Sequence, residues 1–302
     1  MSLTSFLKNK DIKERFRQEF PRPEFKLKKE TLAPPVTRRY SLVGTAFDYL
    51  MRFYLKHINP DAVTTRWVAE SWLRALAWKI PDLELIFYDK GEYEIFPGCI
   101  ERLPKDVKRL IGTCEQIIEQ AKMVYSCYLV SGEMTDEVIR SALLLAQLDP
   151  IFRSGYVDEN LGTIDEGDVI DLRNLISIVN PELFKAKKLC VLNPTFGEAS
   201  RLVGGADADL LIDDALIEIK TTKTLKLDRN YLNQLIGYYV LFKIDGIDDT
   251  PFEPKIERLG IYYSRYGELY TFPVQAIIDE DRLPSFIEWF KERAENRLSV
   301  KK

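Results

Sequence analysis

Four charged residues interrupt an otherwise apolar stretch, GGADADLLIDDALIEIKTTK, at positions 204–223. They are Asp207, Asp209, Glu218 and Lys220. Carboxylates are ligands that hard divalent cations prefer, and a lysine beside them supplies a positive charge or a proton. The stretch therefore has the residue types for metal-assisted or acid–base chemistry, provided that the chain brings them together.

The two apolar runs in this stretch, DLLID and ALIEIK, predict a β-hairpin that turns at residues 213–214. Symmetric pairing about that turn places Asp209 opposite Glu218 and Asp207 opposite Lys220, all on one face of the hairpin. Like charges opposite each other destabilise a sheet. The pattern therefore predicts either a cation between the two carboxylates or a solvated ladder. In that ladder, Asp207 and Lys220 form a salt bridge and the other two side chains splay into water.

Helical patterns lie on both sides of the hairpin. Downstream, RNYLNQLIGYYVLFK (229–243) places Gln234 and Tyr238 four residues apart, on one face of a helix. Upstream, SLVGTAFDYLMRFYLKH (41–57) has apolar residues at helical spacing and carries Asp48. Strands flanked by helices predict an α/β fold with a mixed central sheet.

The remaining segments complete the expected order of elements. We predict helices at 10–20, 62–80, 105–130, 134–148 and 283–298, strands at 189–193 and 198–203, and a hairpin at 257–274. The aromatic run at 261–266 is typical of strand packing, with base stacking as the alternative. We expect a basic N-terminal arm at 1–40 and a single domain at 41–302, with a helical block inserted at about 61–150.

The charge distribution bears on the class of partner. A net charge of −4 argues against binding of nucleic acid through bulk charge. Residues 1–39, however, carry about +6, so this arm is either a solvated tail or a contact for nucleic acid. No apolar run approaches the length of a membrane span and the start lacks a signal-peptide core, so we expect a cytoplasmic protein without a membrane partner.

Cysteine and histidine usage limits the metal chemistry. The four cysteines form no C-x-x-C pair, and His57 is the single histidine. A zinc site of the usual cysteine–histidine kind is therefore not expected. A metal would have to be a hard cation held by carboxylates.

Asp209 follows Ala208, and Glu218 is followed two residues later by Lys220. This arrangement resembles the signature of the PD-(D/E)XK nuclease superfamily, with Ala-Asp in place of Pro-Asp. The resemblance covers about 41–57 and 188–275.

Two helix motifs extend the resemblance to the RecB-like and lambda-exonuclease-like branch of that superfamily. QLIGY at 234–238 resembles the branch's Q-x-x-x-Y motif. GTAFD at 44–48 resembles its G-x-x-x-H motif, with aspartate where histidine is usual. The motifs occur in the family's order. The resemblance thus implies a restriction-endonuclease-like core and a Mg²⁺- or Mn²⁺-dependent deoxyribonuclease, similar to RecB-like exonucleases.

The resemblance also implies roles for individual residues. Asp209 and Glu218 would bind the metal together with the backbone carbonyl of Ile219. Lys220 would orient or deprotonate the attacking water; as a base it would need a pKa well below the ordinary 10.4. Asp48 would add a ligand from the first helix.

Other residues would support these groups. Gln234 and Tyr238 would hold the substrate backbone or brace the site, and Asp207 and Glu198 would be supporting carboxylates. Asp207 lies on the same face as Asp209 and stays an alternative to it as the primary metal ligand. Relatives in this branch often carry an iron–sulfur cluster, but no cysteine follows Cys190, so we expect none here.

Two other interpretations stay open. A protein of nuclease fold could bind DNA or a protein partner without cleaving anything. Asp207-Ala-Asp209 also matches the D-x-D of glycosyltransferases, although that interpretation gives Glu218 and Lys220 no role. The resemblance does not distinguish an exonuclease from an endonuclease. It also does not identify a protein partner in DNA repair, recombination or phage defence.

Overall fold

The computed structural model describes residues 2–77, 79–80, 82–87, 93–96 and 98–299. Its contacts divide the chain into two compact units. The first unit comprises Met1–Leu32, Ile58–Thr65 and Ile178–Lys302, and the second comprises Ala33–His57 and Arg66–Ser177.

This division differs from the expected boundaries. Most of the predicted arm at 1–40 belongs to the first unit, and most of the block expected at about 61–150 belongs to the second. Within that block, positions 78, 81, 88–92 and 97 lie outside the described residues.

A six-stranded mixed sheet forms the centre of the first unit, in the order β1-β4-β5-β6-β7-β8. The strands are β1 (Val63–Thr64), β4 (Cys190–Leu192), β5 (Leu210–Ile212), β6 (Ala215–Lys220), β7 (Arg258–Tyr263) and β8 (Glu268–Pro273). The pairs β1–β4 and β6–β7 are parallel and the other pairs antiparallel. The predicted mixed α/β fold is thus confirmed.

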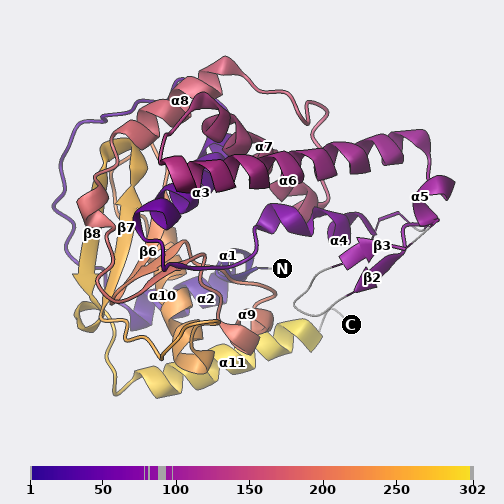
Figure 1. Ribbon diagram of the computed structural model, residues 1–302. Coiled ribbons are helices and arrows are strands. Elements are labelled where there is room, and N and C mark those ends of the chain that lie inside the picture. Colours follow the sequence, from indigo (N-terminus) through magenta and orange to yellow (C-terminus); the bar gives the residue numbers. More distant parts are fainter. Residues whose placement is uncertain (1, 78, 81, 88–92, 97, 300–302) are drawn as a thin grey trace. The chain divides into compact units, whose positions relative to one another are not determined.

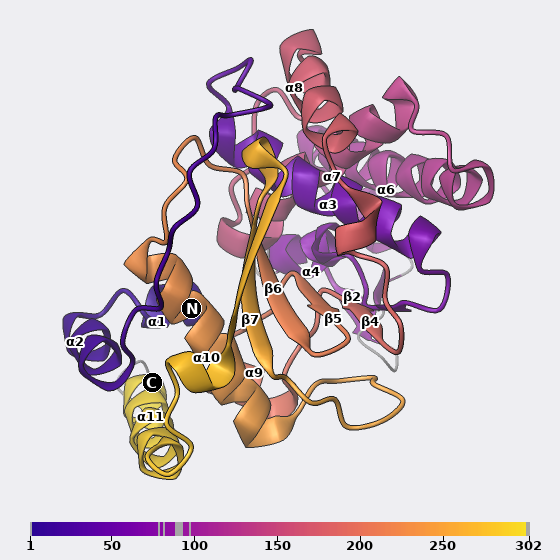
Figure 2. The same ribbon diagram turned by 90° about the vertical axis from the view of Figure 1, so that its left-hand side faces the viewer.

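The helices of the first unit are α1 (Leu3–Phe6), α2 (Lys10–Glu19), α9 (Gly197–Leu202), α10 (Arg229–Asp245) and α11 (Leu283–Ser299), with short 3₁₀ turns η3 (Pro181–Leu183), η4 (Ser264–Tyr266) and η5 (Val274–Ala276). Helix α10 makes the crossover that a parallel pair of strands requires, here β6 and β7. Its Leu232 and Ile236 share one apolar cluster with Leu216 and Ile261 of the sheet. Figure 2 shows α10 along this face of the sheet, with α2 and α11 beyond it.

The N-terminal helices are part of this apolar core. Phe20 packs edge-on against Phe286 of α11, with ring centroids 4.7 Å apart, and Phe6 packs similarly against Phe290 at 5.2 Å. The three side chains Phe6, Phe16 and Phe20 are buried. The first half of the predicted arm is therefore a packed element of the first unit.

The second unit is mainly helical (Figure 1). It contains α3 (Tyr40–Ile58) apart from its last residue, η1 (Val68–Ser71), α4 (Trp72–Ala77), β2 (Leu85–Phe87), β3 (Tyr93–Ile95), α5 (Cys99–Arg102), α6 (Lys105–Ser131), α7 (Asp136–Ser154) and α8 (Glu166–Ser177). A buried hydrogen bond of 2.5 Å joins Tyr49 of α3 to Asp149 of α7, and the Tyr49 hydroxyl accepts the N–H of Ala69 at 2.9 Å. Helix α7 packs against α4, α6, α8 and η1, so it lies at the centre of this unit. Among the described residues, no helix is long and apolar enough to cross a membrane.

Two sequence predictions fail locally. Residues 198–203 were expected as a strand, but residues 198–202 belong to α9. Asp245 and Asp248 stabilise this helix by accepting the N–H groups of Glu198 and Gly197. The segment 62–80 was expected as one helix but contains β1, η1 and α4, and its residue 78 lies outside the described part. The prediction for α9 failed because its capping carboxylates come from distant positions in the chain.

Candidate active site

The hairpin of β5 and β6 has the register that the sequence predicted. Leu210 pairs with Ile217, and Ile212 pairs with Ala215. Asp213 adopts a φ of 52°, the left-handed conformation that a tight two-residue hairpin turn favours. Symmetric pairing about residues 213–214 is therefore confirmed.

At the open end of the hairpin, the register brings the two carboxylates together. Asp209 lies one residue before β5, and its Oδ2 accepts the backbone N–H of Ile219 at 2.6 Å. Asp209 therefore reaches across to the backbone next to Glu218. The carboxylates of Asp209 and Glu218 are therefore neighbours, as the sequence predicted.

Asp207 lies near the other carboxylates. It forms an isolated antiparallel bridge with Thr195, on the β4 side of the chain. Its charge contributes to raising the pKa of Glu218. The predicted pairing of Asp207 with Lys220 stays a prediction.

Glu218 is a buried carboxyl whose pKa is strongly raised. Its side chain is 5% exposed, and Oε1 accepts from Lys220 Nζ at 2.6 Å. Its other oxygen, Oε2, is buried and has no hydrogen-bond partner among the described residues. Burial, and then the charge of Asp209, raise the pKa of Glu218 to about 8, against the lowering effect of Lys220. The solvated ladder, in which this side chain splays into water, is therefore wrong.

Lys220 connects the carboxylates to α10. Its Nζ donates to Gln234 Oε1 at 3.1 Å and lies 5.1 Å from the ring centroid of Tyr231. The Gln234 side-chain amide in turn donates to the Tyr238 hydroxyl at 2.8 Å. The predicted placement of Gln234 and Tyr238 on one helix face is confirmed, and it completes a continuous chain of hydrogen bonds from Glu218.

Tyr238 closes that chain from inside the core. Burial, and then the negative charge of Glu218, raise the pKa of Tyr238 well above its ordinary value, so the hydroxyl stays protonated. Phe196 stacks on its ring, with centroids 5.6 Å apart and planes 16° from parallel. Sequence reasoning missed Phe196 because it precedes the segment wrongly predicted as a strand, and no local pattern marks it.

Two predicted residues lie apart from this group. Glu198 on α9 has a side chain that is 74% exposed and paired with Arg201 at 2.7 Å, so this conformation directs it to solvent. Asp48 is half-buried on α3, in the second unit, and its position relative to the hairpin stays a prediction.

The donor set bears on the predicted metal. Within the described residues, no group of three or more histidine, cysteine, aspartate or glutamate side chains is arranged to hold a metal ion. The predicted set consists of the carboxylates of Asp209 and Glu218 and the backbone carbonyl of Ile219, with Asp48 as a further ligand. The buried Oε2 of Glu218 fits it, because an unsatisfied carboxylate oxygen in the interior is costly unless it binds a cation or a donor.

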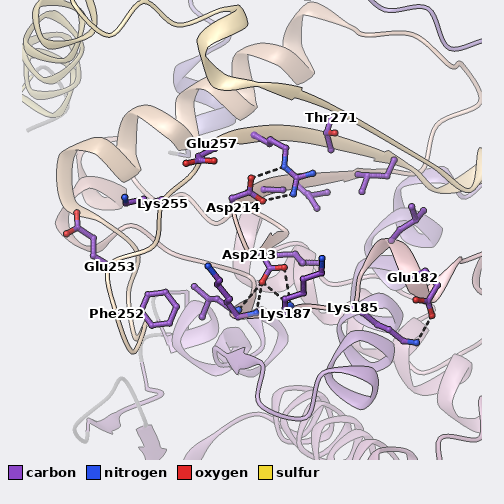
Figure 3. Close-up of a pocket in the computed structure, with 18 residues that line it drawn as sticks. Glu182, Lys185, Lys187, Asp213, Asp214, Phe252, Glu253, Lys255, Glu257 and Thr271 are labelled. Atoms are coloured by element: carbon purple, nitrogen blue, oxygen red, sulfur yellow. Dashed lines mark hydrogen bonds and ion pairs between the residues drawn. The ribbon is translucent and has the colours of Figure 1, made fainter.

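The opposite end of the hairpin faces a cavity of about 940 Å³ (Figure 3). Asp213 there accepts the backbone N–H groups of residues 187–189, and Asp214 accepts from Arg258 Nε at 2.9 Å. Both carboxyl groups are thus satisfied within the protein. This cavity does not coincide with the perturbed residues at the open end.

Comparison of the chain with protein-family models, with curated proteins and with solved structures finds no match.

Proposed function

We propose that this protein is a metal-dependent nuclease that hydrolyses DNA phosphodiester bonds and is related to RecB-like exonucleases. One observation carries the proposal. Glu218 is a buried carboxylate beside Asp209, with one oxygen bound by Lys220 and the other without a hydrogen-bond partner among the described residues. A divalent cation would remove both the repulsion and the unsatisfied oxygen.

The arrangement of the sheet supports a restriction-endonuclease-like core. Strands β4, β5 and β6 are antiparallel neighbours, and α10 then crosses over to the parallel strand β7. The charged residues lie at the open end of the β5–β6 hairpin, and α10 supplies Gln234 and Tyr238. This is the order of parts that the hairpin motif and the Q-x-x-x-Y motif imply.

The carboxylates have the chemistry of metal ligands. Asp209, Glu218 and the carbonyl of Ile219 would hold Mg²⁺ or Mn²⁺, which prefer oxygen donors. When bound, such a cation makes its water a stronger nucleophile and offsets the charge that develops on the phosphoryl group. Asp48 as a further ligand and Asp207 as a supporting carboxylate remain part of the proposal.

Lys220 and α10 would position the reacting groups. The Lys220 ammonium is held by Glu218 and Gln234, which would place it beside the attacking water or a phosphoryl oxygen. The hydroxyl of Tyr238 accepts from the Gln234 amide at 2.8 Å, and the ring of Tyr238 stacks on that of Phe196. Such bracing keeps a lysine in one orientation, which a positioned donor requires.

A cleavage assay with matched variants tests the proposal. The full-length protein is incubated with linear single-stranded DNA, linear duplex DNA and a plasmid, in Mg²⁺, Mn²⁺ or EDTA, beside Lys220→Ala. We expect cleavage that requires the metal and falls about 10³-fold or more in the variant. Asp214→Asn, which changes a carboxylate at the other end of the same hairpin, serves as the control and should retain activity.

The outcomes separate the candidate functions. Absence of cleavage of all three substrates, together with no Mn²⁺ binding by calorimetry, would overturn the proposal. DNA binding without cleavage or metal binding would instead indicate a catalytically silent protein of nuclease fold. Metal-dependent binding of a nucleotide sugar would favour the D-x-D glycosyltransferase.

A further inference from the structure

The segment that leads from the candidate site into α10 carries a regular row of positive charge. From residue 220 to residue 229 every third residue is basic, in the order Lys220, Lys223, Lys226 and Arg229. The segment between β6 and α10 is neither helix nor strand, and Lys223 and Lys226 are exposed. Lys226 lies 3.8 Å from Asp228, at a mainly exposed pair that contributes little energy.

Buried hydroxyl groups fix the backbone of this segment. Tyr263 donates to the carbonyl of Lys226 at 2.9 Å, and Tyr266 donates to the carbonyl of Lys223 at 2.5 Å. Between them in sequence, Ser264 bonds the hydroxyl of Thr221 at 2.9 Å. The aromatic run at 261–266 is therefore buried, as strand packing predicts, and it also holds the lysine-bearing loop in one conformation.

The far end of the row meets two further arginines. Arg229 donates to the carbonyls of Phe16 and Phe20, at the C-terminal end of α2. These contacts place Arg229 beside the chain segment that carries Arg17 and Arg22. Burial, and then the charges of Arg22 and Arg17, lower the pKa of Arg229 to about 10.

This arginine cluster has an excess of positive charge. A helix C-terminus carries about half a negative charge, far less than three guanidinium groups. Arg17 and Arg22 are exposed, and within the described residues neither forms an ion pair with a carboxylate. Because like charges repel, such a cluster is stabilised by an external anion.

We propose that these six residues form a basic track that binds the phosphates of a single DNA strand and leads it to the candidate site. The track consists of Lys220, Lys223, Lys226, Arg229, Arg17 and Arg22. This inference rests on the proposed nuclease function and extends it to substrate positioning. Three residues of extended chain span at most about 10 Å, so successive cations can reach neighbouring phosphates along one strand. The loop that carries Lys223 and Lys226 is fixed at both of their carbonyls, and basic residues at regular intervals along such a loop suit one sugar–phosphate backbone.

The test measures binding without cleavage. A 5′-fluorescein-labelled single-stranded 20-mer is titrated by fluorescence anisotropy in EDTA, at salt concentrations from 50 to 300 mM. The full-length wild type is compared with Lys223→Gln/Lys226→Gln and with Arg17→Gln/Arg22→Gln. Loss of two phosphate contacts should reduce the slope of log affinity against log salt by about 1.4 for a single strand. We expect an affinity loss of about tenfold near 0.1 M salt.

The matched control is Lys187→Gln/Lys188→Gln, which removes two lysines beside the cavity at the turn end of the hairpin. It should leave the slope within about 0.3 of wild type, well below one phosphate contact. In the cleavage assay, the track variants should raise KM and leave kcat unchanged, because they remove binding common to substrate and transition state.

The failures can be told apart. If cleavage requires Lys220 but both track variants keep the wild-type slope, the track is wrong and the nuclease proposal stands. If the track variants lower the slope but no metal-dependent cleavage occurs, the protein binds DNA there and the nuclease proposal is wrong. If the wild type does not bind the 20-mer at 50 mM salt, the track is wrong. The proposal of a track for a single strand is also wrong if the track variants weaken the binding of duplex DNA more than that of single-stranded DNA.

Discussion

The two ends of the β5–β6 hairpin carry the same kinds of residue in opposite states. At the turn end, burial alone would raise the pKa of Asp213, but N–H groups from residues 187–189 more than offset it and the pKa is lowered. The hydrogen bond from Arg258 lowers the pKa of Asp214 as well. At the open end, burial and a neighbouring carboxylate raise the pKa of Glu218 to about 8.

The difference shows that the turn end stabilises the hairpin, whereas the open end contains a group that costs stability. Carboxylates that receive several donors favour folding, so the turn end fixes the register. The open end holds a buried carboxylate that its surroundings do not fully satisfy, which is a pattern common at functional sites. The stable turn thus supports the perturbed site a few residues away.

The largest expected effect is a loss of DNA cleavage when the carboxylate at the open end of the hairpin is removed without disturbing the fold. Glu218→Gln removes the charge that would bind the metal but keeps the shape of the side chain. We expect metal-dependent DNA cleavage to fall by about 10³-fold, equivalent to about 4 kcal/mol of transition-state stabilisation. Asp214→Asn should stay within about twofold of wild type, far below the loss of a catalytic group. Equal activity of the two variants would contradict the contrast between the ends.

The next largest expected effect is a loss of stability when the carboxylate at the turn end is removed. Asp213→Ala leaves three backbone N–H groups without their acceptor and places alanine at a φ of 52°. We expect the free energy of unfolding in urea to fall by about 2 kcal/mol. Asp213→Asn tolerates the same backbone conformation and should lose less. The folded fraction of either variant should cleave DNA normally, and a loss of specific activity larger than the loss of folded protein would contradict this view.

The smallest expected effect is a pH dependence of the free energy of unfolding that comes from Glu218 at the open end. The folded protein binds a proton at Glu218 up to about pH 8, whereas the unfolded chain releases it near the ordinary glutamate pKa. Between these values the folded state binds more protons, so this group's contribution to stability decreases as pH rises. In EDTA, the free energy of unfolding of the wild type should therefore fall between pH 5 and pH 8 by at least about 1 kcal/mol more than that of Glu218→Gln.

Metal addition provides the control for the pH effect. Mn²⁺ competes with the proton for Glu218, so its apparent affinity should increase from pH 6 to pH 8, and it should raise the melting temperature of the wild type most at pH 8. Parallel pH profiles for the wild type and Glu218→Gln in EDTA would show that the carboxyl group is not perturbed.

Local patterns sufficed for the parts of the molecule whose physics is local. The hairpin register follows from two apolar runs about an aspartate pair, and Leu210 does pair with Ile217. Helical spacing likewise placed Gln234 and Tyr238 on one face of α10, where they are joined at 2.8 Å. Short-range geometry leaves few alternatives in such segments.

The failures occur where distant residues decide. The segment expected as a strand at 198–203 forms most of α9, because Asp245 and Asp248 cap the N-terminus of that helix. The stacking of Phe196 on Tyr238 follows from the same placement of α9. Arg17 and Arg22 of the N-terminal segment likewise come near Arg229 only because α2 packs against the start of α10.

The sequence by itself determined which residues could do chemistry and that they would share one face of a hairpin. Alternation along strands and the turn at 213–214 require this, whatever surrounds them. Only the tertiary structure decided the state of those residues. Burial against α10 raised the pKa of Glu218, left its Oε2 without a donor among the described residues and tied Lys220 to Gln234. Desolvation depends on what the whole chain packs around a group, and no short pattern encodes it.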